Sequence, residues 1–145
     1  MANIDQQLMR DIIMDHYEYP RNHSLVDNSN YISKHMDSDS CIDDITVQVD
    51  VKNGVIEDIR FDGIACTIST ASTSIMTELV LGKTLEDARE ILKNYFAMID
   101  EEDFDEDLLE EAVAFKNVGK QANRINCATI GWKALREILD ESEEA

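Results

Sequence analysis

The chain has 145 residues, of which 43% are hydrophobic and 30% charged, a composition that suits one globular domain spanning residues 1–145. Its formal net charge of −18 would repel phosphate backbones and anionic lipid, so we expect neither nucleic acid nor a membrane as a partner. The first residues lack the basic and apolar regions of a secretory signal. Together with three cysteines, this predicts reduced thiols and a cytoplasmic protein.

The first predicted element is a helix over residues 3–17, with Asn3 as its N-cap and Pro20 marking the turn that follows. Its apolar stripe consists of the i,i+4 pairs Leu8 with Ile12 and Met9 with Ile13. We expect this stripe to cover the core, although docking on a partner is the alternative use. His16, near the end of the helix, is interpreted as a structural residue rather than a ligand.

Strands are predicted next, because apolar and polar residues alternate over residues 31–36 and 45–51. The polar residues 37–40 between them form a turn cluster that leads to Cys41. Asn53-Gly54 is a strong hairpin signal, and the return strand covers residues 55–61. Because a hairpin returns the chain beside its start, Cys66 is expected to lie near Cys41 and Asp43.

Several helices are predicted in the second half of the chain. One begins at about residue 67 and stops at Gly82, which places Cys66 at its N-terminus, where the helix dipole favours a thiolate. Thr84 with Asp87 resembles a capping box for a helix over residues 85–98. A further helix is expected near residues 107–115. The last covers residues 126–140, with Asn126 as N-cap and Cys127 in the first turn.

The three cysteines and a nearby carboxylate have two interpretations, a metal site or a set of buried thiols. We hypothesise that Cys41, Asp43, Cys66 and Cys127 meet around one ion, because three thiolates and a carboxylate form a tetrahedral set suited to zinc. The alternative is that the cysteines are buried and unreactive, since no C-x-x-C pair is present. Arg124 is a candidate cation beside the negatively charged ligands, and a surface ion pair is the competing interpretation.

Four segments resemble the IscU/NifU-like iron–sulfur cluster assembly family, and most closely its SufU branch. They are D-H-Y-E-Y-P-R-N at residues 15–22, C-I-D at 41–43, I-E-D-I-R-F-D-G-I-A-C-T-I-S at 56–69 and R-I-N-C-A-T-I-G-W-K-A-L at 124–135. The resemblance covers nearly the whole chain, with its motifs in the family's order. It departs from the family at Ile42 and Ala65, where glycine is usual. Asn126 stands where the IscU branch usually has histidine, which favours the SufU branch.

The resemblance implies an α+β fold in which a three-stranded antiparallel sheet is packed by about five helices. It also implies zinc held by Cys41, Asp43, Cys66 and Cys127. The partners implied are a pyridoxal-phosphate cysteine desulfurase like SufS, which the protein stimulates, and a SufB-containing scaffold. Cys41 would accept the persulfide sulfur from the desulfurase and relay it to that scaffold, so the protein resembles a sulfurtransferase without being a clear enzyme.

Two other functions remain open from the sequence. The same ligands suit a scaffold that assembles a transient [2Fe–2S] cluster, because thiolates bind iron–sulfur clusters as well as zinc. A zinc-stabilised interaction module without chemistry is the third possibility.

Overall fold

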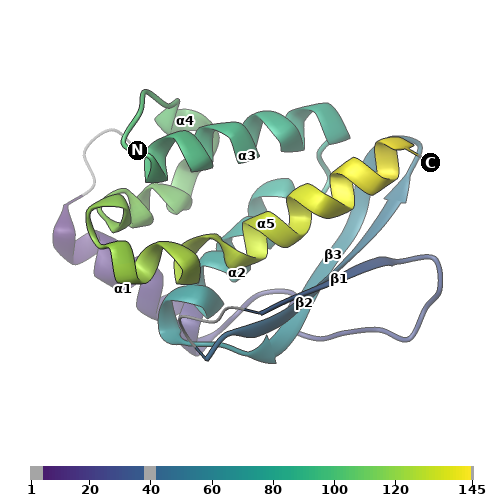
Figure 1. Ribbon diagram of the computed structural model, residues 1–145, viewed down its shortest axis with the longest axis horizontal. Helices are drawn as coiled ribbons and strands as arrows, with labels where there is room; N and C mark the ends of the chain where they lie inside the picture. The colour runs from purple at the N-terminus through teal and green to yellow at the C-terminus, as the bar shows by residue number, and fades with distance from the viewer. Residues whose placement is uncertain (1–4, 38–41, 145) are drawn as a thin grey trace.

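The computed structural model describes residues 5–37 and 42–144, in which a three-stranded antiparallel sheet forms one layer (Figure 1). The strands, in the spatial order β1-β2-β3, are β1 (Ile32–Asp37), β2 (Asp44–Lys52) and β3 (Val55–Ile64). Asn53 and Gly54 turn between β2 and β3 with φ of 55° and 74°, as the hairpin signal predicts. β3 continues to Ile64, three residues beyond the predicted end, and so reaches the site described below.

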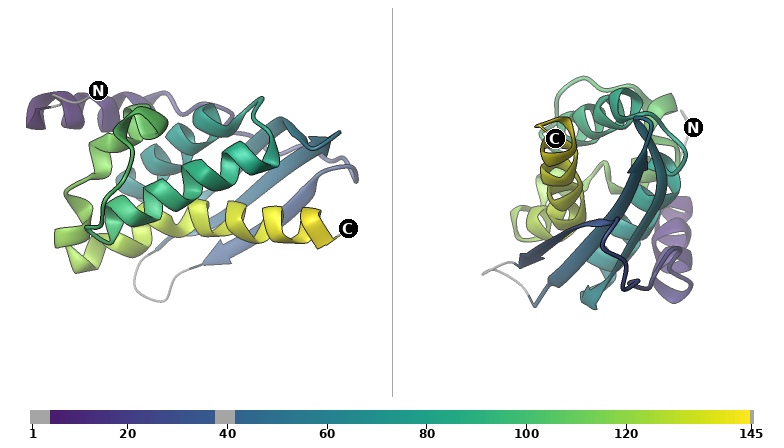
Figure 2. Two further views of the ribbon diagram at one scale, coloured as in Figure 1. Left: turned by 90° about the horizontal axis from the view of Figure 1, so that it is seen from above. Right: turned by 90° about the vertical axis from the view of Figure 1, so that its right-hand side faces the viewer.

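The other regular elements of the described chain are helices. They are α1 (Gln6–Glu18), α2 (Thr67–Val80), α3 (Leu85–Ile99), α4 (Glu106–Leu109), the 3₁₀ helices η1 (Glu110–Phe115) and η2 (Val118–Lys120), and α5 (Ala122–Glu144). α5 crosses the sheet and packs on β1 and β2, while α2 packs on β3 (Figure 1). α1 and α5 lie on opposite sides of α2, and α3 packs on α2 and α5 (Figure 2). The α+β architecture is therefore the one expected from the sequence.

Side-chain capping explains where two of the helices begin. The Asp5 carboxylate accepts the Leu8 N–H at 2.7 Å and caps α1, whereas the predicted cap Asn3 lies outside the described residues. The predicted apolar stripe is partly wrong, since Leu8 is 40% exposed. The buried face instead runs through Met9, Ile12 and the polar His16. Thr84 accepts the Asp87 N–H and caps α3, as predicted.

Two helices in the second half lie where they were predicted but differ from the prediction in their bounds or continuity. The helix expected near residues 107–115 breaks at Glu110, whose φ of 46° interrupts the α-helix, and η1 continues as a 3₁₀ helix. The last helix begins at Ala122, so Asn126 lies inside α5 and does not cap it. The extra turn is consistent with the good helix formers Ala122 and Arg124 and with the packing of Ile125 against the core.

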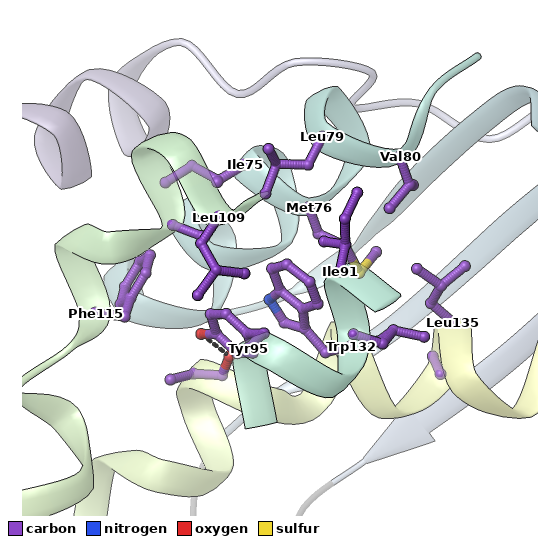
Figure 3. Packing of buried hydrophobic residues seen from close by; sticks show 14 of the residues in the cluster. Ile75, Met76, Leu79, Val80, Ile91, Tyr95, Leu109, Phe115, Trp132 and Leu135 are labelled. Carbon is purple, nitrogen blue, oxygen red and sulfur yellow. Dashed lines mark hydrogen bonds between the residues drawn. The ribbon is translucent and has the colours of Figure 1, made fainter. Parts of the chain in front are cut away.

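The core is centred where α2, α3 and α5 meet (Figure 3). The Trp132 and Tyr95 rings stack with centroids 3.8 Å apart and an interplanar angle of 4°. The Trp132 indole N–H donates to Ser72 Oγ at 2.9 Å, and both Ser72 and Tyr95 donate to the Ala128 carbonyl at 2.7 Å. These bonds satisfy the Trp132 indole N–H and the hydroxyls of Ser72 and Tyr95, and they fix α5 against α2.

The approach of α5 to α2 is close enough to require glycine. A Cβ added at Gly131 would lie 2.4 Å from Thr73 Oγ1 and 2.8 Å from Thr73 Cγ2. This contact sets the spacing of the two helices that carry Cys66 and Cys127. Within the described ranges, every helix is too short or too polar to span a bilayer.

Candidate metal centre

Three of the four predicted ligands converge at one end of the sheet. Asp43 precedes β2, Cys66 precedes α2, and Cys127 lies in α5, yet one ligand atom from each falls within 4.8 Å of the others. The pairing of Asp44 with Ile64 places the start of β2 beside the end of β3, as the hairpin argument requires. The predicted proximity of Asp43 and Cys66 is therefore confirmed.

The Asp43 carboxylate is held in place by its own hydrogen bonds. It is only 2% exposed, and Oδ1 accepts the Cys66 backbone N–H at 2.8 Å. Oδ2 accepts the Ser69 hydroxyl and lies 3.8 Å from Cys66 Sγ. A carboxylate that accepts hydrogen bonds from two donors, one on each oxygen, keeps one orientation, as metal-binding carboxylates usually do. The sequence analysis did not identify Ser69, although it lies one helical turn after Cys66.

Cys66 is the N-cap residue of α2, as predicted. Its backbone is extended, with φ −72° and ψ 174°, and its Sγ accepts the Ser69 N–H at 3.4 Å. The Ser69 hydroxyl lies 3.4 Å from the same sulfur. These two contacts fix the position of the Cys66 sulfur at the start of α2, beside the Asp43 carboxylate.

Cys127 is positioned differently from the prediction. It is 7% exposed and lies in the second turn of α5, because the helix begins at Ala122. The free N–H groups of a helix belong to its first turn, so Cys127 lies beyond the turn that could stabilise a thiolate. Arg124 is exposed in the first turn and lines a pocket of 340 Å³ with Met9 and Ile68. Its role beside the ligands stays a prediction.

Cys41 lies outside the described residues, so its part in the site remains a prediction. Asp37 and Asp44, which flank it in the sequence, pair with each other at the end of the β1–β2 ladder. Next to this pair, Gly63 has a φ of 137°, and a Cβ there would lie 2.0 Å from the Asp44 carbonyl oxygen. Only glycine fits this close approach, which keeps β3 tight against β2 beside Asp43.

The described donors fit a zinc ion. Zinc binds thiolate sulfur at about 2.3 Å and carboxylate oxygen at about 2.1 Å, so sulfur and oxygen ligands of a tetrahedral ion lie about 3.6 Å apart. The 3.8 Å between Cys66 Sγ and Asp43 Oδ2 is close to that separation. A site of two sulfurs and one oxygen also leaves a fourth position for a further ligand.

Comparisons with known proteins agree on one family. Residues 8–141 match the family model described as the NifU-like N-terminal domain. Over 143 residues the chain is 36% identical to the zinc-dependent sulfurtransferase SufU of Bacillus subtilis strain 168, covering 98% of this chain and 95% of that protein. Over 135 residues it is 35% identical to the iron–sulfur cluster assembly scaffold protein IscU of Streptococcus pyogenes serotype M1, covering 92% and 84% of the two chains.

A solved structure is also similar. The crystal structure of a putative iron–sulfur cluster assembly scaffold protein for the SUF system, from Fervidobacterium islandicum AW-1, gives a TM-score of 0.82. The two sequences are 32% identical, and the match covers 89% of this chain and 94% of the other.

Proposed function

Because this chain belongs to the family of NifU-like N-terminal domains and thus to iron–sulfur cluster assembly, we propose that it is a zinc-dependent sulfur-transfer protein. The observation that carries the proposal is the convergence of Asp43, Cys66 and Cys127 within 4.8 Å. The 36% identity to a zinc-dependent sulfurtransferase over almost the whole chain supports the same choice.

We assign the ligands of the zinc to Asp43, Cys66, Cys127 and Cys41. Cys41 is two residues from Asp43, so their Cα atoms are at most about 7 Å apart whatever the backbone conformation. When bound, the zinc would stabilise thiolates at neutral pH without redox chemistry of its own. Asp43, fixed by Cys66 and Ser69, would present one oxygen ligand among sulfurs.

Cys41 is the proposed sulfur acceptor. Its thiolate would attack the terminal sulfur of a persulfide on a SufS-like cysteine desulfurase. A new sulfur–sulfur bond forms on Cys41, the old one breaks, and the desulfurase cysteine leaves as a thiolate. The transferred sulfur keeps its oxidation level, and the total charge of the two proteins is unchanged. The sulfur would then pass to a SufB-containing scaffold. This transfer requires reduced thiols, and therefore a reducing compartment such as the cytoplasm.

The alternative function is a scaffold that assembles a [2Fe–2S] cluster on the same residues. It is favoured by the identity to an IscU scaffold and by the suitability of thiolates for iron. Elemental analysis and an absorption spectrum of the purified protein distinguish the two. Colourless protein with zinc supports the sulfur-transfer proposal, whereas brown protein with iron and acid-labile sulfide supports the scaffold.

Sulfur transfer itself is tested by incubating the protein with its desulfurase and L-cysteine. Peptide mass spectrometry without reductant should then show one added sulfur on Cys41, and Cys41→Ser should remove the stimulation of desulfurase turnover. Cys127→Ser is the comparison variant, because it alters a ligand without removing the acceptor. Sulfur found on Cys66 or Cys127 in the parent would overturn the assignment of Cys41.

A further inference from the structure

His16 is a buried residue with an unexplained polar atom. Its side chain is fully buried on α1, and Nδ1 lies 2.8 Å from Ser74 Oγ. Within the described part of the chain, Nε2 has no hydrogen-bond partner. Leaving a buried polar atom unpaired costs about 1–3 kcal/mol, so an unpaired nitrogen in a folded protein suggests a ligand.

Two carboxylates face this nitrogen from other helices. Glu78 Oε1 on α2 is 3.7 Å from His16 Nε2, and Glu111 Oε2 on η1 is 3.6 Å away. One ligand atom from each of the three residues lies within 4.8 Å of the others. Both distances exceed the usual hydrogen-bond range, but ligands of a tetrahedral zinc with bonds of 2.0–2.2 Å lie about 3.4 Å apart.

We propose that His16, Glu78 and Glu111 form a second divalent-metal site, separate from the cysteine centre. In the tautomer whose Nδ1–H donates to Ser74 Oγ, the lone pair on Nε2 is directed at two carboxylates, which is repulsive unless a cation lies between them. In the other tautomer Nε2–H points at the carboxylates and no metal is needed. Burial, followed by the charge of Arg21, lowers the pKa of His16 below its ordinary value. Its imidazole is therefore neutral and able to coordinate at neutral pH.

The two carboxylates border a pocket that leaves room for water on their outer side. Glu78 and Glu111 are about half exposed, at 48% and 46% of their side chains. They line a pocket of 220 Å³ together with Ile75, Leu79 and Glu110. One nitrogen and two oxygens form a harder ligand set than the cysteine centre, suited to Zn²⁺, Fe²⁺ or Mn²⁺, of which Zn²⁺ is expected to bind most tightly.

An ion here would join three elements, of which α1 and α2 are already linked by the hydrogen bond between His16 and Ser74. α1 packs on both α2 and η1, and the ligands come one from each of them (Figure 1). Arg21 already donates to Asp15 at 2.7 Å, and its Nε lies 3.7 Å from Glu78 Oε1. The competing explanation is thus a structural cluster of charges in which Arg21 balances Glu78 without a metal.

The test is a calorimetric titration of the full chain, already loaded with one zinc at the cysteine centre, with further Zn²⁺. We expect a second binding event that Glu78→Gln and Glu111→Gln each weaken at least ten-fold. Both glutamates are half exposed, so these variants should fold. Glu110→Gln is the matched control, because it removes the same charge from the same pocket without touching His16, and it should change the affinity less than two-fold.

Hydrogen exchange gives a second measurement on the same samples. The second zinc should slow exchange of the α1 amides in the parent and in Glu110→Gln, but not in Glu111→Gln. Absence of a second binding event in the parent would overturn the proposal. Equal weakening by Glu110→Gln and Glu111→Gln would also overturn it, by showing only non-specific attraction to the acidic surface.

Discussion

At the scale of single residues, the candidate centre depends on Asp43 as a ligand and as a hydrogen-bond acceptor. Replacing Asp43 by alanine removes the oxygen ligand and leaves the Cys66 N–H and the Ser69 hydroxyl without their acceptor. We expect Asp43→Ala to release zinc on the order of ten times faster or more, measured with a coloured chelator. Release at the parent rate would show that Asp43 does not bind the metal.

Ser69 is expected to act through Asp43. Ser69→Ala removes the hydroxyl that orients the carboxylate, and loss of such a partner typically weakens metal binding by roughly 10-fold or more. Ser72→Ala is the control, since it also deletes a buried hydroxyl of α2 but one that contacts Trp132 and Ala128 instead. Competition for zinc with a coloured chelator should show weaker zinc binding for Ser69→Ala alone. Equal losses in both variants would mean that helix stability, not carboxylate orientation, is responsible.

The sequence predicted the convergence of Asp43 and Cys66 better than the residues that hold them in place. Asn53-Gly54 and strand alternation were enough to bring Asp43 and Cys66 together, because a hairpin has a defined geometry. Ser69 is one of several small polar residues in α2, and its role depends on the position of Asp43 in three dimensions. His16 was interpreted as a structural histidine for the same reason, since only tertiary packing brings Glu78 and Glu111 to it.

At the scale of elements, the spacing of α2 and α5 positions Cys66 relative to Cys127. Gly131→Ala would place a methyl group against Thr73 and push the two helices apart. We expect a loss of about 1–3 kcal/mol in the free energy of unfolding, measured with urea, together with weaker zinc binding.

Thr73→Ala tests the cause of that loss. The Thr73 hydroxyl has no hydrogen-bond partner among the described residues, so its removal should cost little. The double variant Thr73→Ala/Gly131→Ala should recover much of the lost stability, with a coupling energy of about 1–2 kcal/mol. Additive effects of the two substitutions would exclude this contact as the reason for the close approach.

Helix ends were the least predictable part of the fold. Asn126 has the side chain of an N-cap, but packing of Ile125 extends α5 by a turn, so the local signal was misleading. The break at Glu110 has no glycine or proline to mark it, and it separates α4 from η1. That break precedes Glu111, so the geometry of the proposed second metal site depends on a feature without a sequence signal.

At the scale of the whole molecule, zinc is expected to contribute to folding. Its proposed ligands among the described residues come from the start of β2, the start of α2 and the second turn of α5, so the ion would connect the hairpin to the last helix. At a free zinc concentration about 1,000 times the Kd, binding contributes about 4 kcal/mol.

Removing the zinc should therefore lower Tm by on the order of 10 °C in a thermal scan. Cys127→Ser should lower it in the same direction, and zinc should restore less stability to this variant than to the parent. An unchanged Tm after complete removal of the metal would contradict a role for zinc in folding.

The stacked pair in the core also gives the protein an optical signal. Trp132 is the single tryptophan, so its fluorescence comes from one indole stacked on Tyr95 and hydrogen-bonded to Ser72. Ser72 and Tyr95 both donate to the carbonyl of Ala128, the residue directly after Cys127. Any shift of α5 when a metal binds or leaves Cys127 changes the surroundings of that indole. The emission of the unlabelled protein can thus report metal exchange at its centre in real time.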